Sequence, residues 1–314
     1  MSASWLFFPD EEQFGQAAAS HAGRLARAVL EKHPHFTLAL SGGRGPLPFF
    51  RHLADADLFA PEMWTRTHIF FVDERMVPPD HADSNFGSAR RHLLDRVPVP
   101  EENIHRMPGE LPQAAAAAAY TETLDGFFGC RPPVFDLLVL GMGADGHTAS
   151  IFPGCSLQDG NQPVSPATAP GATVSARLTL TGPVLDAAAN VLFLVLGADK
   201  HEPLRRIRSG DRSLPAGRVR GGQDAPGRLH PVEAGHAQVH EHDVGGEVPG
   251  ELHGRGAVGG LTHDLDVGGG AEHAHDPRAH HRVVVDDEEA HRRSRAEGGR
   301  GGRGQSEGVI HRGI

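Results

Sequence analysis

Four short apolar runs, each followed at once by small or charged residues, constrain the fold of this chain most. They are residues 36–40 (FTLAL), 67–72 (THIFFV), 135–140 (FDLLVL) and 191–196 (VLFLVL). Runs that are apolar almost throughout, without polar alternation, are typical of strands that are buried on both faces of a parallel sheet. The sequence therefore predicts the α/β class, with a mainly parallel sheet that is covered by helices on both faces.

Helical signals separate the apolar runs. The segments with helical periodicity, capping residues or high helix propensity are residues 11–31, 48–59, 84–94 and 114–128. Pro46 suits the first turn of the second helix, and Ser84 suits the N-cap of the third. Residues 173–180 alternate loosely between polar and apolar, and we expect them to form an edge strand.

The ends of the predicted strands carry groups that suit an anionic ligand. In open parallel sheets, ligands bind beyond the carboxyl ends of the strands. Here those ends are Ser41-Gly42-Gly43, Asp73-Glu74-Arg75, residues 141–147 (GMGADGH) and residues 197–200 (GADK). A glycine turn can present backbone N–H groups to a phosphate, and Arg75 and Lys200 would add positive charge. Each motif alone is also typical of an ordinary turn, but their agreement at one edge predicts a binding site.

Asp145-Gly146-His147 is the strongest acid/base candidate in the chain. A neutral histidine on a glycine-rich loop can take a proton from water, and a neighbouring carboxylate can orient its ring. Gly141 and Gly143 match part of a dinucleotide-binding fingerprint, but the rest of that motif is missing, so we expect no NAD binding.

The segments around these groups resemble 6-phosphogluconolactonase, a family of the glucosamine/galactosamine-6-phosphate isomerase superfamily. In chain order the matching segments are LALSGGRGP, FFVDERMVPPDHADSNFG, FDLLVLGMGADGHTASIFPG, ARLTL and VLFLVLGADK, and the resemblance runs from about residue 10 to about residue 220. It implies a three-layer α/β fold like that of sugar-phosphate isomerases. It also implies hydrolysis of 6-phospho-D-glucono-1,5-lactone to 6-phosphogluconate in the oxidative pentose phosphate pathway, with neither a metal nor an organic cofactor.

The resemblance also implies roles for individual residues. The expected catalytic residues are His147 as the general base that activates water, Asp145 as the group that orients it, and Arg75. The residues expected to bind the substrate or its phosphate, or to balance developing negative charge, are Ser41, Gly42, Gly43, Arg75, Arg177 and Lys200. Asp73 and Asn85 look structural.

The chain departs from the family in its first glycine turn. The family usually has SGGSTP, whereas this chain has SGGRGP, with Arg44 and Gly45 in place of two hydroxyl residues. Arg44 either substitutes as a phosphate ligand or points to solvent, and we do not assign it to the site.

The final 94 residues differ in composition from the rest. Residues 221–314 hold 12 of the 22 His and 21 of the 40 Gly but no Phe, Trp or Tyr, which leaves little material for a core. We therefore expect a lactonase-like domain at residues 1–220 and a Gly/His/Arg-rich tail at 221–314. The tail is either disordered or the product of a change in reading frame, which would remove the family's final strand and helix. A His-rich metal-binding tail is a third, less favoured interpretation.

Charge and hydropathy exclude other classes of protein. The formal net charge of −10 excludes a generally basic nucleic-acid binder, and no apolar stretch is long enough for a membrane helix. The first residues lack a basic region, so we expect no signal peptide and a cytoplasmic location. We also expect a monomer, and the family resemblance implies that its ligand is a sugar-phosphate lactone. The alternatives are a glucosamine-6-phosphate deaminase-like isomerase and a non-catalytic or unstable binder of sugar phosphates.

Overall fold

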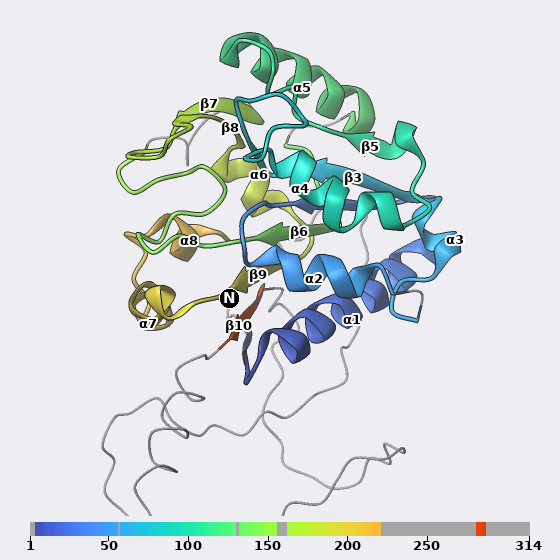
Figure 1. Ribbon diagram of the computed structural model, residues 1–314, viewed down its shortest axis with the longest axis horizontal. Helices are drawn as coiled ribbons and strands as arrows, with labels where there is room; N and C mark the ends of the chain where they lie inside the picture. Colours follow the sequence, from blue (N-terminus) through green and yellow to red (C-terminus); the bar gives the residue numbers. More distant parts are fainter. Residues whose placement is uncertain (1–3, 56, 130–131, 156–161, 221–280, 287–314) are drawn as a thin grey trace, which may run out of the picture. The chain divides into compact units, whose positions relative to one another are not determined.

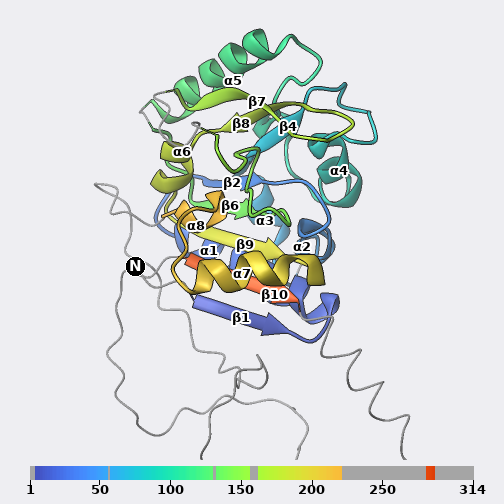
Figure 2. The ribbon, with the colours of Figure 1, turned by 90° about the vertical axis from the view of Figure 1, so that its left-hand side faces the viewer.

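The computed structural model describes residues 4–55, 57–129, 132–155, 162–220 and 281–286, which belong to one compact unit. Within them, seven parallel strands form the central sheet (Figure 2). In spatial order these are β1 (Ser4–Phe8), β10 (His281–Asp286), β9 (Val191–Val195), β6 (Leu137–Leu140), β2 (Phe36–Leu40), β3 (Thr67–Phe71) and β5 (Ile104–His105). The four apolar runs of the sequence form β2, β3, β6 and β9, so the predicted parallel sheet is confirmed.

The middle of the sheet is fully buried. All five residues of β2 are buried, and Leu38 pairs with Ile69 of β3 on one side and with Leu137 of β6 on the other. Asp136, the one charged residue of the third apolar run, accepts hydrogen bonds from the backbone N–H and the hydroxyl of Thr37 at 2.8 and 2.7 Å. These bonds satisfy a carboxylate that burial would otherwise destabilise.

Helices cover both faces of the sheet, as expected for three layers (Figure 1). One face carries α1 (Glu11–Leu30), α2 (Pro46–Leu53) and α3 (Pro61–Trp64), and the other carries α6 (Gly182–Ala187), α7 (His201–Arg208) and α8 (Pro215–Arg218). α1 begins after Asp10, whose carboxylate accepts the Gln13 N–H at 2.8 Å. α2 ends at Leu53, earlier than the sequence predicts, because a turn begins at Ala54, whose N–H bonds to the carbonyls of the last helical turn.

A second, smaller sheet is antiparallel and has the order β4 (Asp73–Arg75), β8 (Ala176–Leu180) and β7 (Val164–Thr168). The segment 173–180 was expected at a sheet edge, and this expectation is wrong, because β8 pairs with β4 on one side and with β7 on the other. Pairing on both sides explains why four of its five residues are buried.

Two further helices, α4 (Asn85–His92) and α5 (Gln113–Phe128), pack against the small sheet. The short 3-10 helices are η1 (Leu94–Arg96) beside α4, η2 (Glu101–Asn103) beside β3 and η4 (Ala198–Lys200) beside α7. The predicted cap of α4 is confirmed, because Ser84 Oγ accepts the Gly87 N–H at 3.0 Å.

Strand β10 comes from the segment that the sequence analysis assigns to the tail. It lies between β1 and β9 and pairs in parallel with both, from Arg282 to Asp286 along β1 and from His281 to Val285 along β9. This strand was not predicted, because only one short run, RVVV, carries a strand signal within a Gly- and His-rich stretch. The other residues of 221–314 lie outside the described part of the chain, so the proposed metal-binding tail falls there, except for His281 in β10.

No helix in the described part of the chain is long and apolar enough to cross a membrane.

Candidate active site

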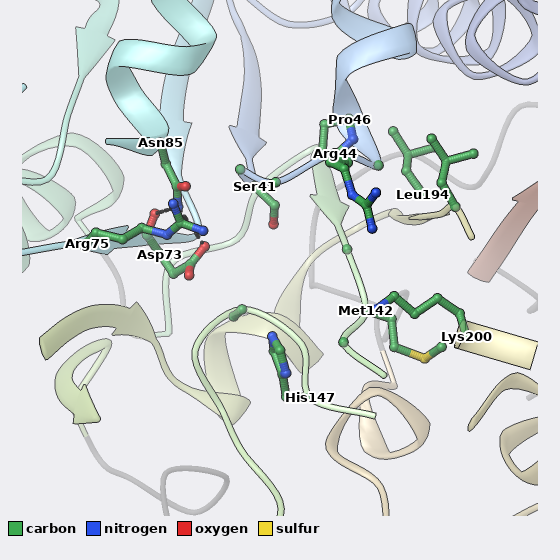
Figure 3. A pocket seen from close by; sticks show the side chains of 17 residues that line it. Ser41, Arg44, Pro46, Asp73, Arg75, Asn85, Met142, His147, Leu194 and Lys200 are labelled. Carbon is green, nitrogen blue, oxygen red and sulfur yellow. Dashed lines mark hydrogen bonds between the residues drawn. The ribbon is translucent and has the colours of Figure 1, made fainter. Parts of the chain in front are cut away.

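A cavity of about 230 Å³ lies where the loops after β2, β3, β6 and β9 converge (Figure 3). It is lined by Ser41, Gly42, Gly43, Arg44, Gly45, Pro46, Asp73, Arg75, Asn85, Gly141, Met142, Gly143, His147, Ala149, Leu194, Leu196 and Lys200. This volume is below the roughly 300–1,000 Å³ of sites for drug-sized ligands, so it suits a small metabolite. The convergence follows from the parallel sheet, whose strand ends all meet at one edge.

His147 and Asp145 form a tight pair in the loop after β6. His147 Nδ1 lies 2.6 Å from Asp145 Oδ1, and the same oxygen accepts the backbone N–H of His147 at 3.1 Å. Burial would raise the pKa of Asp145, but these bonds and the nearby imidazole outweigh burial and lower it. An ionised Asp145 therefore keeps a proton on Nδ1 of His147 and leaves Nε2 free to accept another.

Glycines let the His147 loop fold tightly. A Cβ on Gly143 would lie 2.1 Å from His147 Nδ1 and 2.5 Å from Asp145 Oδ1, so only glycine leaves room for the pair. Gly146 has a positive φ of 80°, and its carbonyl accepts the Ala216 N–H of α8 at 3.0 Å. The Leu214 side chain packs against the same glycine, so α8 supports the loop from outside.

Asp73 and Asn85 form part of the opposite wall. Asn85 Nδ2 donates to the Asp73 carbonyl at 2.8 Å and to its Oδ1 at 3.2 Å, and Ser150 Oγ donates to Asp73 Oδ2 at 2.7 Å. A Cβ on Gly42 would lie 1.8 Å from Asn85 Oδ1. Position 42 therefore requires glycine because Asn85 leaves no space for a side chain, and not because of an unusual backbone conformation.

Glu74 ties β4 to the start of α4. Its buried carboxylate accepts the backbone N–H groups of Arg75, Asn85 and Phe86 at 2.7 to 2.8 Å and the hydroxyl of Ser84 at 3.1 Å. Burial raises the pKa of Glu74, although these N–H donors act in the opposite direction. The carboxylate lies at a helix N-terminus, where the peptide dipoles favour negative charge, so it holds the backbone of Arg75 and Asn85 in place.

Arg75 and Arg177 face one another across the small sheet. They are directly opposite residues in the antiparallel β4–β8 pair, so their side chains leave the same face. Arg177 is only 9% exposed and its Nη1 has no hydrogen-bond partner among the described residues, whereas Arg75 Nη1 donates to the Asp83 carbonyl at 2.6 Å. Burial, followed by the charge of Arg75, lowers the pKa of Arg177. Two adjacent guanidinium groups with a free donor are suited to an anion.

Ser41 and Lys200 complete the lining. Ser41 is buried, and its Oγ has no hydrogen-bond partner in the described structure. Lys200 Nζ makes an ion pair with Asp199 Oδ2 at 2.7 Å. The hydrogen bond from Lys200 is the main reason why the pKa of Asp199 is lowered.

Most of the residues expected from the sequence line this cavity. These are Ser41, Gly42, Gly43, Arg75, His147 and Lys200. Asp145 adjoins the cavity through His147, and Arg177 lies outside the lining but opposite Arg75. Arg44, which was not assigned to the site, and Asp73 and Asn85, which were expected to be structural, also line the cavity. The position of Arg44 in the glycine turn was visible in the sequence, but a turn sequence does not show in which direction a side chain points.

Comparison with known proteins decides the family. The sequence profile of the family described as glucosamine-6-phosphate isomerases/6-phosphogluconolactonase matches residues 9–229, more than half of the chain. The chain belongs to this family. Among its relatives, the 6-phosphogluconolactonase of Rattus norvegicus is 39% identical over 217 residues, 68% of this chain and 84% of the rat protein. The human 6-phosphogluconolactonase is 40% identical over 212 residues, 66% of this chain and 82% of that protein.

Solved structures of the isomerase/lactonase family share the fold. The 6-phosphogluconolactonase of Thermotoga maritima is 32% identical, with a TM-score of 0.63 over 70% of this chain and 95% of that one. The Trypanosoma brucei 6-phosphogluconolactonase is 28% identical, with a TM-score of 0.64 over 71% and 93% of the two chains. A monomeric glucosamine-6-phosphate deaminase is 16% identical with a TM-score of 0.62, which shows a common fold alone.

Proposed function

We propose that this protein hydrolyses 6-phospho-D-glucono-1,5-lactone to 6-phosphogluconate, as a lactonase of the pentose phosphate pathway. The observation that carries the proposal is the His147–Asp145 pair, which lies in a cavity that also contains Arg75 and Lys200. A general base between cations suits water attack on the ester of an anionic substrate. The names of the rat and human relatives support the same reaction.

In this proposal His147 moves the protons. Its Nε2 takes a proton from water while the water oxygen bonds to the lactone carbonyl carbon, and the carbonyl oxygen becomes an oxyanion. The oxyanion then re-forms the carbonyl, the bond from that carbon to the ring oxygen breaks, and the ring oxygen takes the proton from His147. Asp145, through Nδ1, orients the ring and stabilises the imidazolium.

The cations surround the reacting group in the proposal. Arg75 and Lys200 lie on opposite sides of the cavity in Figure 3, so they can serve both the phosphate and the negative charge that develops at the carbonyl oxygen. Arg177 adds its unpaired guanidinium nitrogen next to Arg75. The turn of Ser41, Gly42 and Gly43, which precedes α2, binds the phosphate of the substrate.

The chemistry of the described residues requires no metal in this proposal. Within the described part of the chain, no group of three His, Cys, Asp or Glu side chains is arranged to hold a metal ion. The proposal also takes the protein as a cytoplasmic monomer without a nucleic-acid partner. Light scattering of the purified protein tests the monomer.

A direct assay tests the proposed reaction. Purified protein is expected to release acid from 6-phosphogluconolactone faster than the spontaneous rate, and His147→Ala to lower kcat at least about 100-fold. His33→Ala is the matched control, because His33 precedes the amino end of β2, whereas the cavity lies beyond its carboxyl end. Equal activity of wild type and His147→Ala would contradict the mechanism. Activity on glucosamine 6-phosphate alone would contradict the proposed substrate.

A further inference from the structure

Arg44 occupies the place where this chain departs from the family's glycine-turn pattern, and it lines the cavity. Figure 3 shows its side chain directed into the cavity from the side of the Ser41 turn, on the same side as Lys200 and away from Arg75. Its backbone belongs to the turn that precedes α2, next to the N-cap Gly45. Arg44, in place of the family's hydroxyl residue, therefore adds a positive charge inside the cavity.

Gly45 explains how Arg44 reaches this position. A Cβ on Gly45 would lie 2.5 Å from the carbonyl oxygen of Leu194, so any larger residue would push the turn away from β9. Lys200 follows β9 through Gly197 and η4. Glycine at position 45 thus brings the turn against the strand that leads to Lys200, and the two departures from the family pattern act together.

Charge balance gives Arg44 a distinct contribution. Lys200 is paired with Asp199 at 2.7 Å, so that pair alone is close to neutral. The Arg44 side chain forms no hydrogen bond or ion pair with any residue that the structure describes, although its charge reaches Asp199 and helps to lower the pKa of that carboxyl. The net positive charge on this side of the cavity therefore comes from Arg44, and its guanidinium donors are available to a ligand.

We propose that Arg44 binds the phosphate of the substrate together with Lys200 and the Ser41–Gly43 turn, and so determines specificity for phosphorylated over unphosphorylated lactones. The planar guanidinium can donate two parallel hydrogen bonds to phosphate oxygens, which the family's small hydroxyl residue cannot do. This inference rests on the proposed lactonase function for its kinetic consequence, but the binding of phosphate itself does not depend on turnover.

Kinetics with two substrates test the specificity. Arg44→Ala is expected to raise KM for 6-phosphogluconolactone about tenfold or more and to leave kcat within about twofold, because the lost contact is far from the reacting carbonyl. KM for unphosphorylated glucono-1,5-lactone should not change, and Arg44→Lys should restore part of the affinity. Arg51→Ala is the control, since Arg51 lies on α2 but pairs with Glu11 at the surface. An unchanged KM in Arg44→Ala would overturn the proposal.

Phosphate binding separates this inference from the proposed function. Titration calorimetry with inorganic phosphate is expected to show binding that weakens about tenfold in Arg44→Ala and stays unchanged in Arg51→Ala. If the wild type hydrolyses no lactone but shows this pattern, the lactonase proposal fails and Arg44 remains a phosphate ligand. If phosphate binds both proteins equally, the role of Arg44 is overturned whether or not the lactone is hydrolysed.

Discussion

Gly143 and His147 are in contact in a way that no other residue at position 143 would allow. A Cβ at that position would lie 2.1 Å from His147 Nδ1, the atom that meets Asp145. Atoms that are not bonded do not approach so closely, so a methyl group there must displace the imidazole. The His147–Asp145 pair therefore requires glycine at position 143 for lack of space. Backbone conformation does not require it, since the φ of Gly143 is not positive.

Replacing Gly143 by alanine is expected to lower kcat at least about tenfold while the fold survives, because the ring moves out of line with Asp145. Steady-state kinetics and thermal unfolding measure the two effects. Gly126→Ala, in α5 where an added Cβ meets nothing within 4 Å, is the control and should keep full activity. Full activity in Gly143→Ala would show that the pair tolerates the displacement.

Arg177 should matter more for binding than for stability. Its buried Nη1 lacks a partner in the described structure, and Arg75 lies opposite, so the folded protein gains little from this charge. Arg177→Met is expected to raise KM for the phosphorylated lactone about tenfold, with a free energy of unfolding that is unchanged or higher. Urea unfolding and kinetics measure the two quantities. A strong loss of stability with an unchanged KM would assign Arg177 a structural role instead.

A histidine cluster outside the cavity predicts how stability depends on pH. His105 Nε2 lies 3.1 Å from His68 Nδ1, and burial, followed by the charge of His68, lowers the pKa of His105 to about 4. The unfolded chain binds this proton near the ordinary histidine value of about 6.5, so stability should fall as the pH drops from about 6.5 to about 4. His105→Phe should reduce this fall, as measured by urea unfolding at several pH values, because phenylalanine keeps the ring stacked on Phe70.

The control for this cluster is His33→Ala, which changes a histidine outside it and should leave the pH dependence as in the wild type. A His105→Phe protein whose stability falls as steeply as that of the wild type would show that other groups cause the acid sensitivity.

Strand β10 makes the domain boundary testable. It pairs with five residues of β1 and with five of β9, so a chain that ends at residue 220 loses the neighbour that joins β1 to the sheet. Such a chain is expected to unfold roughly 10 °C or more below one that ends at residue 286. Thermal unfolding of the two chains provides the measurement. Equal unfolding temperatures would support a complete domain at residues 1–220.

Local patterns were enough to predict much of the fold. The buried strands β2, β3, β6 and β9 are visible because apolar runs in a parallel sheet need no partner to be recognised. Ser84 is a visible cap because its bond to the Gly87 N–H spans only three residues. His147 and Asp145 are two residues apart, so their pairing is also a local event.

Features that depend on distant segments escaped prediction. The β4–β8 pair brings Arg75 and Arg177 together across 102 positions, and no periodicity within either strand indicates its partner. The insertion of β10 likewise depends on β1 and β9, because β10 hydrogen-bonds to the backbone of both strands and both are far from it in the sequence.

The sequence by itself determined which residues end the buried strands, and therefore that Ser41, Arg75, His147 and Lys200 share one edge of the sheet. Only the tertiary structure decided that Arg44 enters that cavity. The reason is physical: the position of a buried strand follows from a local run of apolar residues, whereas the direction of a turn side chain depends on backbone contacts such as Gly45 with Leu194, which lie 149 positions apart.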